Sequence, residues 1–142
     1  MARISKDEYY LNIAKAVSQR STCIRRQYGA VIVKDDRIIS TGYNGSARGE
    51  TNCCDHNICW REENNIPHGE RYEKCRSVHA EDNAISQAGR EALGATLYLY
   101  GREGFRKIDA IPCEMCMRKI KNAGIHKVIN SSNDYKYRVE LV

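Results

Sequence analysis

The 142-residue sequence has no long run of apolar residues. Its longest apolar stretches, 29–33 and 97–99, are far shorter than the roughly 20 residues that a membrane-spanning helix needs. The start of the chain also lacks the basic, apolar and small-residue succession of a secretory signal, so we expect a cytoplasmic protein with no membrane partner. There is no internal repeat, low-complexity tract or linker, which predicts a single domain over residues 1–142.

A dense stripe of basic residues is missing as well. The net charge of +5 comes from 23 basic and 18 acidic residues that are scattered along the chain. This balance suits a small substrate that carries a phosphate. It argues against a dedicated nucleic-acid binder, whose basic residues gather on one face.

The pattern of apolar and turn-forming residues predicts an α/β fold. Ser5 and Glu8 have the spacing of a capping box, and apolar residues at helical spacing follow over 6–20. Residues 29–41 have the pattern of a β-hairpin with a polar turn. The remaining elements that we expect are helices over 79–88 and 113–122, and strands over 96–100, 127–130 and 137–142. Since strand–helix–strand units favour parallel crossovers, we predict a three-layer sandwich with a mixed five-stranded sheet.

Two short motifs indicate a catalytic zinc site. His79-x-Glu81 and Pro112-Cys113-x-x-Cys116 match the signature of zinc-dependent nucleobase deaminases. Two thiolates and one imidazole leave the fourth tetrahedral position of zinc open for water. A helix that starts near Pro112 places both sulfurs on one face, and its positive end would lower the pKa of Cys113. We therefore predict His79, Cys113 and Cys116 as the zinc ligands.

Glu81 is the predicted catalytic residue. It lies two residues beyond His79, so it can reach a zinc-activated water without being a ligand. It would take a proton from that water and deliver protons to the ring nitrogen and the departing amine. The motifs thus predict hydrolytic removal of an exocyclic amino group from a nucleobase. A purely structural zinc knuckle is the alternative, but such sites usually take four protein ligands.

From about residue 8 to residue 130, the chain resembles the cytidine/deoxycytidylate deaminase superfamily, and most of all its deoxycytidylate (dCMP) branch. Besides the zinc motifs, the resemblance includes residues 20–23, 29–33 and 40–45. The segment Gly42-Tyr43-Asn44-Gly45 is more particular to that branch than the zinc motifs are. It implies conversion of dCMP and water to dUMP and ammonia. It also implies a homo-oligomer, commonly a hexamer, with dCTP activation and dTTP inhibition in regulated members.

The resemblance also implies substrate contacts. Asn44 would contact the sugar or the base, although Asn-Gly is equally a strong turn signal. Arg25 and Arg26 precede the predicted hairpin and could meet the phosphate of the substrate, or they could be solvated surface residues.

Seven cysteines in a reducing compartment favour metal binding over disulfides. The family often carries a second, structural zinc ion near the active site. Cys23 and Cys53 match positions that bind it in similar enzymes. Cys59 and Cys75 could complete a four-cysteine site that holds the long segment 43–75, which has little periodicity. Alternative ligands left open are Cys54, His56 and His68, and reduced cysteines without metal are the plainer interpretation.

Two features depart from the dCMP branch. Residues 101–110 are inserted beside the Pro-Cys motif, and the chain stops soon after the last strands, where a further helix is usual. Because the insert adjoins the metal helix, another free base, a nucleoside or a modified nucleotide is an alternative substrate. A tRNA adenosine deaminase, which shares the same metal motif, is a further alternative, and the scattered charge argues against it. The alternative of a different class is a non-enzymatic zinc-binding module, against which Glu81 argues.

Overall fold

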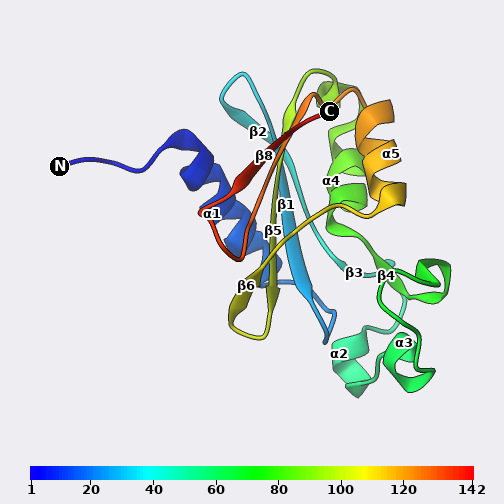
Figure 1. The fold of residues 1–142 in the computed structure, drawn as a ribbon. Coiled ribbons are helices and arrows are strands. Elements are labelled where there is room, and N and C mark those ends of the chain that lie inside the picture. The colour runs from blue at the N-terminus through cyan, green and yellow to red at the C-terminus, as the bar shows by residue number, and fades with distance from the viewer.

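The computed structural model describes residues 1–142 as a central β-sheet with helices on both faces (Figure 1). Helix α1 (Lys6–Ser18) covers one face, and helices α4 (Ala80–Ala88) and α5 (Glu114–Asn122) lie on the other. This arrangement confirms the predicted three-layer sandwich. None of the helices has both the length and the apolar character needed to span a membrane.

The sheet has the strand order β2-β1-β5-β7-β8. These strands are β1 (Gln27–Lys34), β2 (Arg37–Tyr43), β5 (Thr96–Glu103), β7 (Lys127–Asn130) and β8 (Arg138–Leu141). The chain passes from β5 through α5 to β7, and these two strands are parallel, as the crossover argument predicted. The other neighbours are antiparallel. The fold class is therefore as expected, a mixed sheet between two layers of helices.

Residues 101–110 form regular structure where the sequence indicated an irregular insert. Strand β5 continues to Glu103, the chain turns at Gly104 with a φ of +63°, and β6 (Arg106–Ile108) returns antiparallel to β5. The sheet therefore has six strands instead of the predicted five. A three-residue strand is too short to show a period-two pattern, which is why the sequence did not reveal it.

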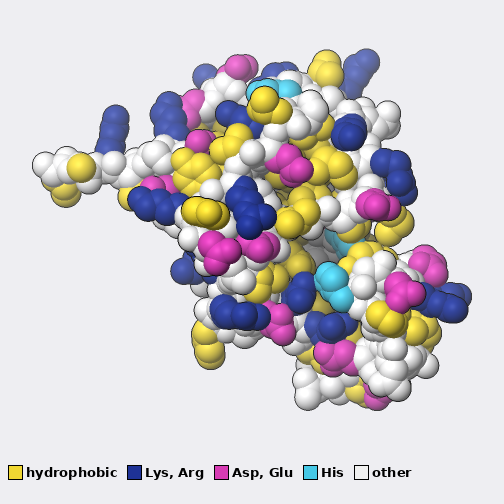
Figure 2. Space-filling model, in the orientation of Figure 1, with side chains coloured by type: hydrophobic (Ala, Val, Ile, Leu, Met, Phe, Trp, Pro, Cys, Tyr) yellow, Lys and Arg dark blue, Asp and Glu magenta, His cyan; other side chains and the backbone are white.

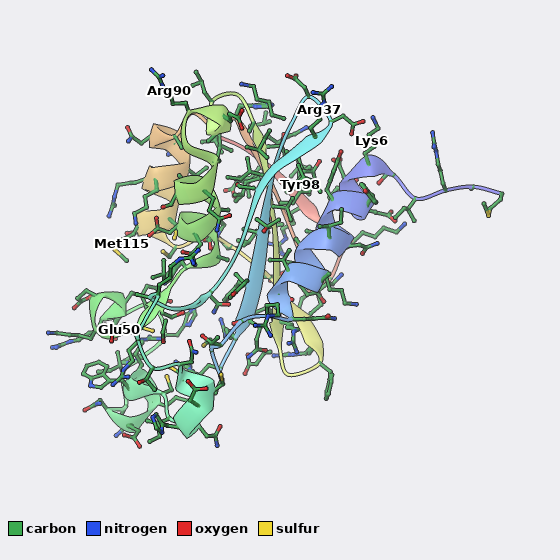
Figure 3. All side chains as sticks on the ribbon, turned by 180° about the vertical axis from the view of Figure 1, so that it is seen from behind. Lys6, Arg37, Glu50, Arg90, Tyr98 and Met115 are labelled. Carbon is green, nitrogen blue, oxygen red and sulfur yellow. The ribbon has the colours of Figure 1, made fainter.

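Each face of the sheet has its own apolar core. On one side, Tyr10, Leu11 and Ala14 of α1 pack on residues such as Val31 and Tyr98, and Figure 3 shows Tyr98 between the sheet and α1. On the other side, the fully buried apolar residues of α4 are all alanines, Ala80, Ala84 and Ala88, and the partly buried Ile85 packs against the same core. The small alanine side chains allow the helix to approach the strands closely.

The predicted hairpin turn forms, and of the predicted capping box at α1 the Ser5 half forms, while the carboxylate of Glu8 pairs with Lys136. The hydroxyl of Ser5 accepts a hydrogen bond from the amide of Glu8 at 3.2 Å and caps α1. Asp35 and Asp36 have φ angles of 50° and 59°, which suit the tight two-residue turn of a hairpin. Lys6, the first residue of α1, forms an ion pair with Asp36 of that turn at 2.7 Å, and Figure 3 shows Lys6 beside the hairpin end that carries Arg37.

Residues 47–76, which we call the cysteine lobe, extend away from the sheet below α4 and α5 (Figure 1). The lobe contains α2 (Cys53–His56), α3 (Trp60–Glu63) and the 3₁₀ turn η1 (Tyr72–Lys74). Strands β3 (Gly45–Ser46) and β4 (Ser77–Val78) pair where the chain enters and leaves it. The lobe thus returns the chain directly to the start of α4.

Candidate metal centre and substrate cavity

The three predicted zinc ligands meet where α4 and α5 begin. His79 is the N-cap of α4, Cys113 is the N-cap of α5, and Cys116 lies in the first turn of α5. Nδ1 of His79 is 3.2 Å from Sγ of Cys116 and 3.6 Å from Sγ of Cys113, and the three atoms lie within 4.8 Å of one another. A tetrahedral zinc ion with ordinary bond lengths separates its nitrogen and sulfur ligands by about 3.6 Å. The donor set and its spacing therefore fit zinc.

The two thiols of this cluster shift each other's pKa in opposite directions. The pKa of Cys113 is lowered, first because the Cys116 thiol donates a hydrogen bond to it and then because of His79. The pKa of Cys116 is raised, chiefly by the same bond. The amide of Cys116 also donates to Sγ of Cys113 at 3.4 Å, so the predicted effect of the helix start is present but smaller. Zinc binding would require both thiols to lose their protons, because both sulfurs bind zinc as thiolates.

Glu81 lies in the first turn of α4, where its side chain is only 5% exposed and lines the cavity beside the ligand cluster. Burial raises the pKa of this carboxyl above its usual value. A carboxyl with a raised pKa can both accept and donate a proton near neutral pH.

The cluster opens into a cavity of about 660 Å³, a size typical of small-molecule sites. Figure 2 shows the hollow between the main body and the cysteine lobe, with histidine and basic side chains around it. Figure 3 places Met115, a lining residue, at the end of α5 nearest the lobe. The structure brings most of the predicted site residues to its walls: Cys23, Arg25, Arg26, Asn44, Cys59, Cys75, His79, Glu81 and Cys113.

Asn44 is buried in the cavity wall between β2 and β3. Its Oδ1 accepts hydrogen bonds from the hydroxyl of Ser21 at 2.6 Å and from the amide of Tyr28 at 2.8 Å. Its Nδ2 donates to the carbonyl of Arg26 at 2.9 Å, which leaves one amide hydrogen free. The side chain of Asn44 therefore holds residues 21–28 in place, in addition to any role of Asn44-Gly45 as a turn.

Both predicted arginines lie in ion pairs at the cavity. Nε of Arg25 is 2.9 Å from Glu62 of the lobe, and Nε of Arg26 is 3.3 Å from Glu103 at the end of β5. His68 lies among these cations, since partial burial and then Arg26, Arg61 and Arg25 lower its pKa. One end of the cavity is thus rich in positive charge.

The cysteine lobe brings the four predicted cysteines into one region. Burial, followed by the nearby thiols of Cys23, Cys75 and Cys59, raises the pKa of Cys53. Cys54, one of the alternatives, is exposed. The four sulfurs are not gathered as tightly as the His79 cluster, which is the one group with metal-binding spacing.

Sequence reasoning missed several residues of the cavity wall: Tyr28, Arg61, Arg71, Tyr72, Ile111 and Arg118. Arg118 lies one turn after Glu114 on the helix that carries the cysteines, and both residues line the cavity. The others come from the irregular lobe or flank a motif, and no spacing distinguishes them. Of the insert, only Asp109 lines the wall, and Glu103 reaches the cavity indirectly through its ion pair with Arg26.

The protein is an α/β/α sandwich with one imidazole, two thiols and a buried carboxyl at two adjoining helix starts. This combination defines the zinc-binding domain of nucleobase deaminases. Residues 4–132 match the family model described as "Cytidine and deoxycytidylate deaminase zinc-binding region". The chain belongs to this cytidine and deoxycytidylate deaminase family.

Individual relatives agree with this assignment. The chain is 39% identical over 127 residues to the deoxycytidylate deaminase of Schizosaccharomyces pombe, with 89% of this chain and 37% of the relative covered. It is 40% identical over 132 residues to that of Mycobacterium phage D29, with 91% and 96% covered. The chain therefore spans less than half of the yeast relative. It is also similar to the dCMP deaminase of cyanophage S-TIM5 in complex with dCMP and dUMP, with TM-score 0.63, 27% identity, and 92% and 83% covered.

Proposed function

We propose that the protein converts dCMP and water to dUMP and ammonia. The observation that carries this proposal is the buried carboxyl of Glu81 beside the His79, Cys113 and Cys116 cluster, at a cavity whose other end is basic. Support for the substrate comes from the phage relative, which is named a deoxycytidylate deaminase and is covered over 96% of its length. The S-TIM5 enzyme, with the same fold, was crystallised with dCMP and dUMP.

In this reaction His79, Cys113 and Cys116 would hold the zinc ion. When bound, zinc supplies a Lewis acid that acidifies a water molecule. The carboxylate of Glu81 takes the proton that this water releases and passes it to the ring nitrogen of cytosine. The oxygen of the water forms a bond to the ring carbon that carries the amine. Glu81 then takes the second proton from that oxygen and delivers it to the exocyclic amine as the carbon–nitrogen bond breaks and ammonia leaves. Burial favours the protonated form that Glu81 must hold between these steps.

The basic end of the cavity suits the phosphate of a nucleotide. Arg25 and Arg26 are the proposed phosphate contacts, and each must exchange its carboxylate partner, Glu62 or Glu103, for the phosphate. The free amide hydrogen of Asn44 can donate to the sugar or the base. These contacts predict a preference for dCMP over deoxycytidine.

Turnover of dCMP, deoxycytidine, cytidine, dCTP and a tRNA hairpin with a reactive adenosine tests the proposal. We expect dCMP to be the best substrate, and activity on the hairpin alone would contradict it. Glu81→Gln should lower kcat by a factor of about 10² to 10⁴ and retain the bound zinc. Near-normal turnover by that variant would overturn the role of Glu81.

A second zinc site, at Cys23, Cys53, Cys59 and Cys75, is also part of the proposal. Its support is the convergence of these four thiols around Cys53. Metal analysis should find two zinc ions per chain, and one in Cys53→Ser; Cys54→Ser, which changes an exposed thiol, is the matched control. A single zinc ion in the unmodified protein would exclude the second site. Assembly into a homo-oligomer, with regulation by dCTP and dTTP, stays a prediction of the family resemblance.

A further inference from the structure

One aromatic ring of the cysteine lobe packs directly on a metal ligand. The ring of Tyr72 meets that of His79 edge to face, with centroids 5.4 Å apart and an interplanar angle of 74°. The guanidinium of Arg61 lies over the same tyrosine ring, 4.7 Å from its centroid. We propose that Tyr72, held by Arg61, is a positioning residue that fixes the imidazole of His79 for metal binding. This inference rests on the proposed role of His79 as a zinc ligand.

Arg61 is an unusual cation because it is buried without an acidic partner. It is 6% exposed, and none of the ion pairs of the protein includes it. Its Nη2 donates to the carbonyl of Pro67 at 2.6 Å, and its Nε donates to the carbonyl of Glu70 at 3.2 Å. Burying a charge is costly unless other groups compensate it. The two carbonyls and the tyrosine ring compensate the charge of Arg61, and they hold its guanidinium in this position.

The two carbonyl bonds of Arg61 give the loop before Tyr72 its shape. Residues 64–71 contain no helix or strand, and Gly69 and Arg71 have φ angles of 90° and 54°. No backbone ladder therefore holds this loop. Because Tyr72 follows at once as the first residue of η1, the position of its ring depends on the bonds that Arg61 makes. A continuous line of contacts thus runs from α3 in the lobe to the metal centre.

The orientation of His79 needs such support. Its side-chain hydrogen-bonding contacts are made by Nδ1, toward the sulfurs of Cys116 and Cys113. In most metal sites the second ring nitrogen of a ligating histidine bonds a carboxylate or a carbonyl, which fixes the ring. Here the protein places the edge-to-face contact with Tyr72 beside the imidazole instead. The tyrosine ring restricts rotation of His79 by packing.

Metal affinity tests this inference independently of turnover. Tyr72→Leu removes the ring, Tyr72→Phe keeps it, and Arg61→Met removes its anchor. Tyr135→Leu is the control, because Tyr135 is 68% exposed and lies outside the lobe and the cavity wall. Zinc affinity is measured by competition with a chelator, and ligand geometry by the visible absorption of the cobalt-substituted protein. Loss of a residue that orients a metal ligand typically costs 10–100-fold in affinity.

We expect Tyr72→Leu and Arg61→Met to weaken zinc binding by about tenfold or more and to alter the cobalt spectrum. Tyr72→Phe and the control should behave as the unmodified protein. Thermal unfolding checks that each variant is folded. If Tyr72→Leu does not fold, the zinc affinity and cobalt spectrum of Arg61→Met test the inference in its place. Unchanged affinity and spectrum would overturn the inference, as would a raised KM for dCMP with normal zinc affinity. If the unmodified protein bound no metal, the proposed metal site itself would fail.

Discussion

A methyl group at Gly42 tests how closely the sheet and the metal-site helix must pack. Gly42 lies in β2 under α4, and a Cβ there would be 2.5 Å from the carbonyl oxygen of Ala80 and 2.6 Å from the amide nitrogen of Ala84. Real Cβ atoms stay at least 3.0 Å from such atoms. In Gly42→Ala, the first turn of α4 must therefore move away from the sheet by about 0.5 Å, the difference between 3.0 and 2.5 Å.

This displacement acts directly on the candidate site, because the moved turn contains Glu81 and begins at His79. Their partners Cys113 and Cys116 belong to α5, which makes no such contact with Gly42. A misplacement of about 1 Å can cost about 10²-fold in rate, so we expect about a tenfold loss of kcat/KM for half that shift. Overpacking should also lower the free energy of unfolding by about 1–3 kcal/mol.

Gly29→Ala is the matched control for strain without displacement of the site. A Cβ at Gly29, on the opposite face of the sheet, would collide with the backbone of Ala14 and Ser18 in α1. Urea unfolding, zinc affinity and dCMP turnover are measured for both variants. Both should be destabilised, and only Gly42→Ala should lose zinc affinity and turnover. Normal turnover in Gly42→Ala, or an equal loss of turnover in a folded Gly29→Ala, would refute the reasoning.

Three further predictions concern other parts of the molecule. Asn44→Ala should lower the free energy of unfolding by about 2–4 kcal/mol in urea titrations, because the three hydrogen bonds of its buried amide are lost together. The bond to Asp36 raises the pKa of Tyr10 to about 12. The pKa of tyrosine in the unfolded chain is about 10. The stabilisation that the bond to Asp36 gives is therefore complete below pH 10 and is lost as the pH rises through 12. The free energy of unfolding of Tyr10→Phe should depend less on pH in this range than that of the unmodified protein, and an equal dependence would contradict the prediction. Phe105→Ser should leave the KM for dCMP unchanged and should change the free energy of unfolding by no more than about 0.5 kcal/mol, because this side chain is fully exposed at the turn of the insert. A changed KM would show that the insert does reach the substrate.

The metal centre could be predicted from the sequence because its geometry is local. His79 and Glu81 lie within one helix start, and Cys113 and Cys116 within another, so spacing and helix geometry nearly define the site. The opposite wall of the cavity could not be predicted in this way. Arg61 and Tyr72 come from an irregular lobe whose shape depends on bonds to individual carbonyls, and such bonds leave no period in the sequence. The short strand β6 was missed for the same lack of a readable pattern.

The segment Gly42-Tyr43-Asn44-Gly45, on which the resemblance to the dCMP branch partly rests, acts through packing on both sides of the cavity. Gly42 lets α4 approach the sheet, which places Glu81 and His79. Two residues later, Asn44 holds the segment that carries Arg25 and Arg26, and it does so with side-chain bonds to Ser21, Tyr28 and the carbonyl of Arg26. A Cβ at Gly45 would come within 2.6 Å of the Thr22 hydroxyl in that same segment. One short stretch therefore influences the distance between the Glu81 carboxyl, the proposed proton carrier, and the proposed phosphate contacts. That distance must match the length of the nucleotide, so this segment can determine substrate choice even where its side chains do not touch the substrate.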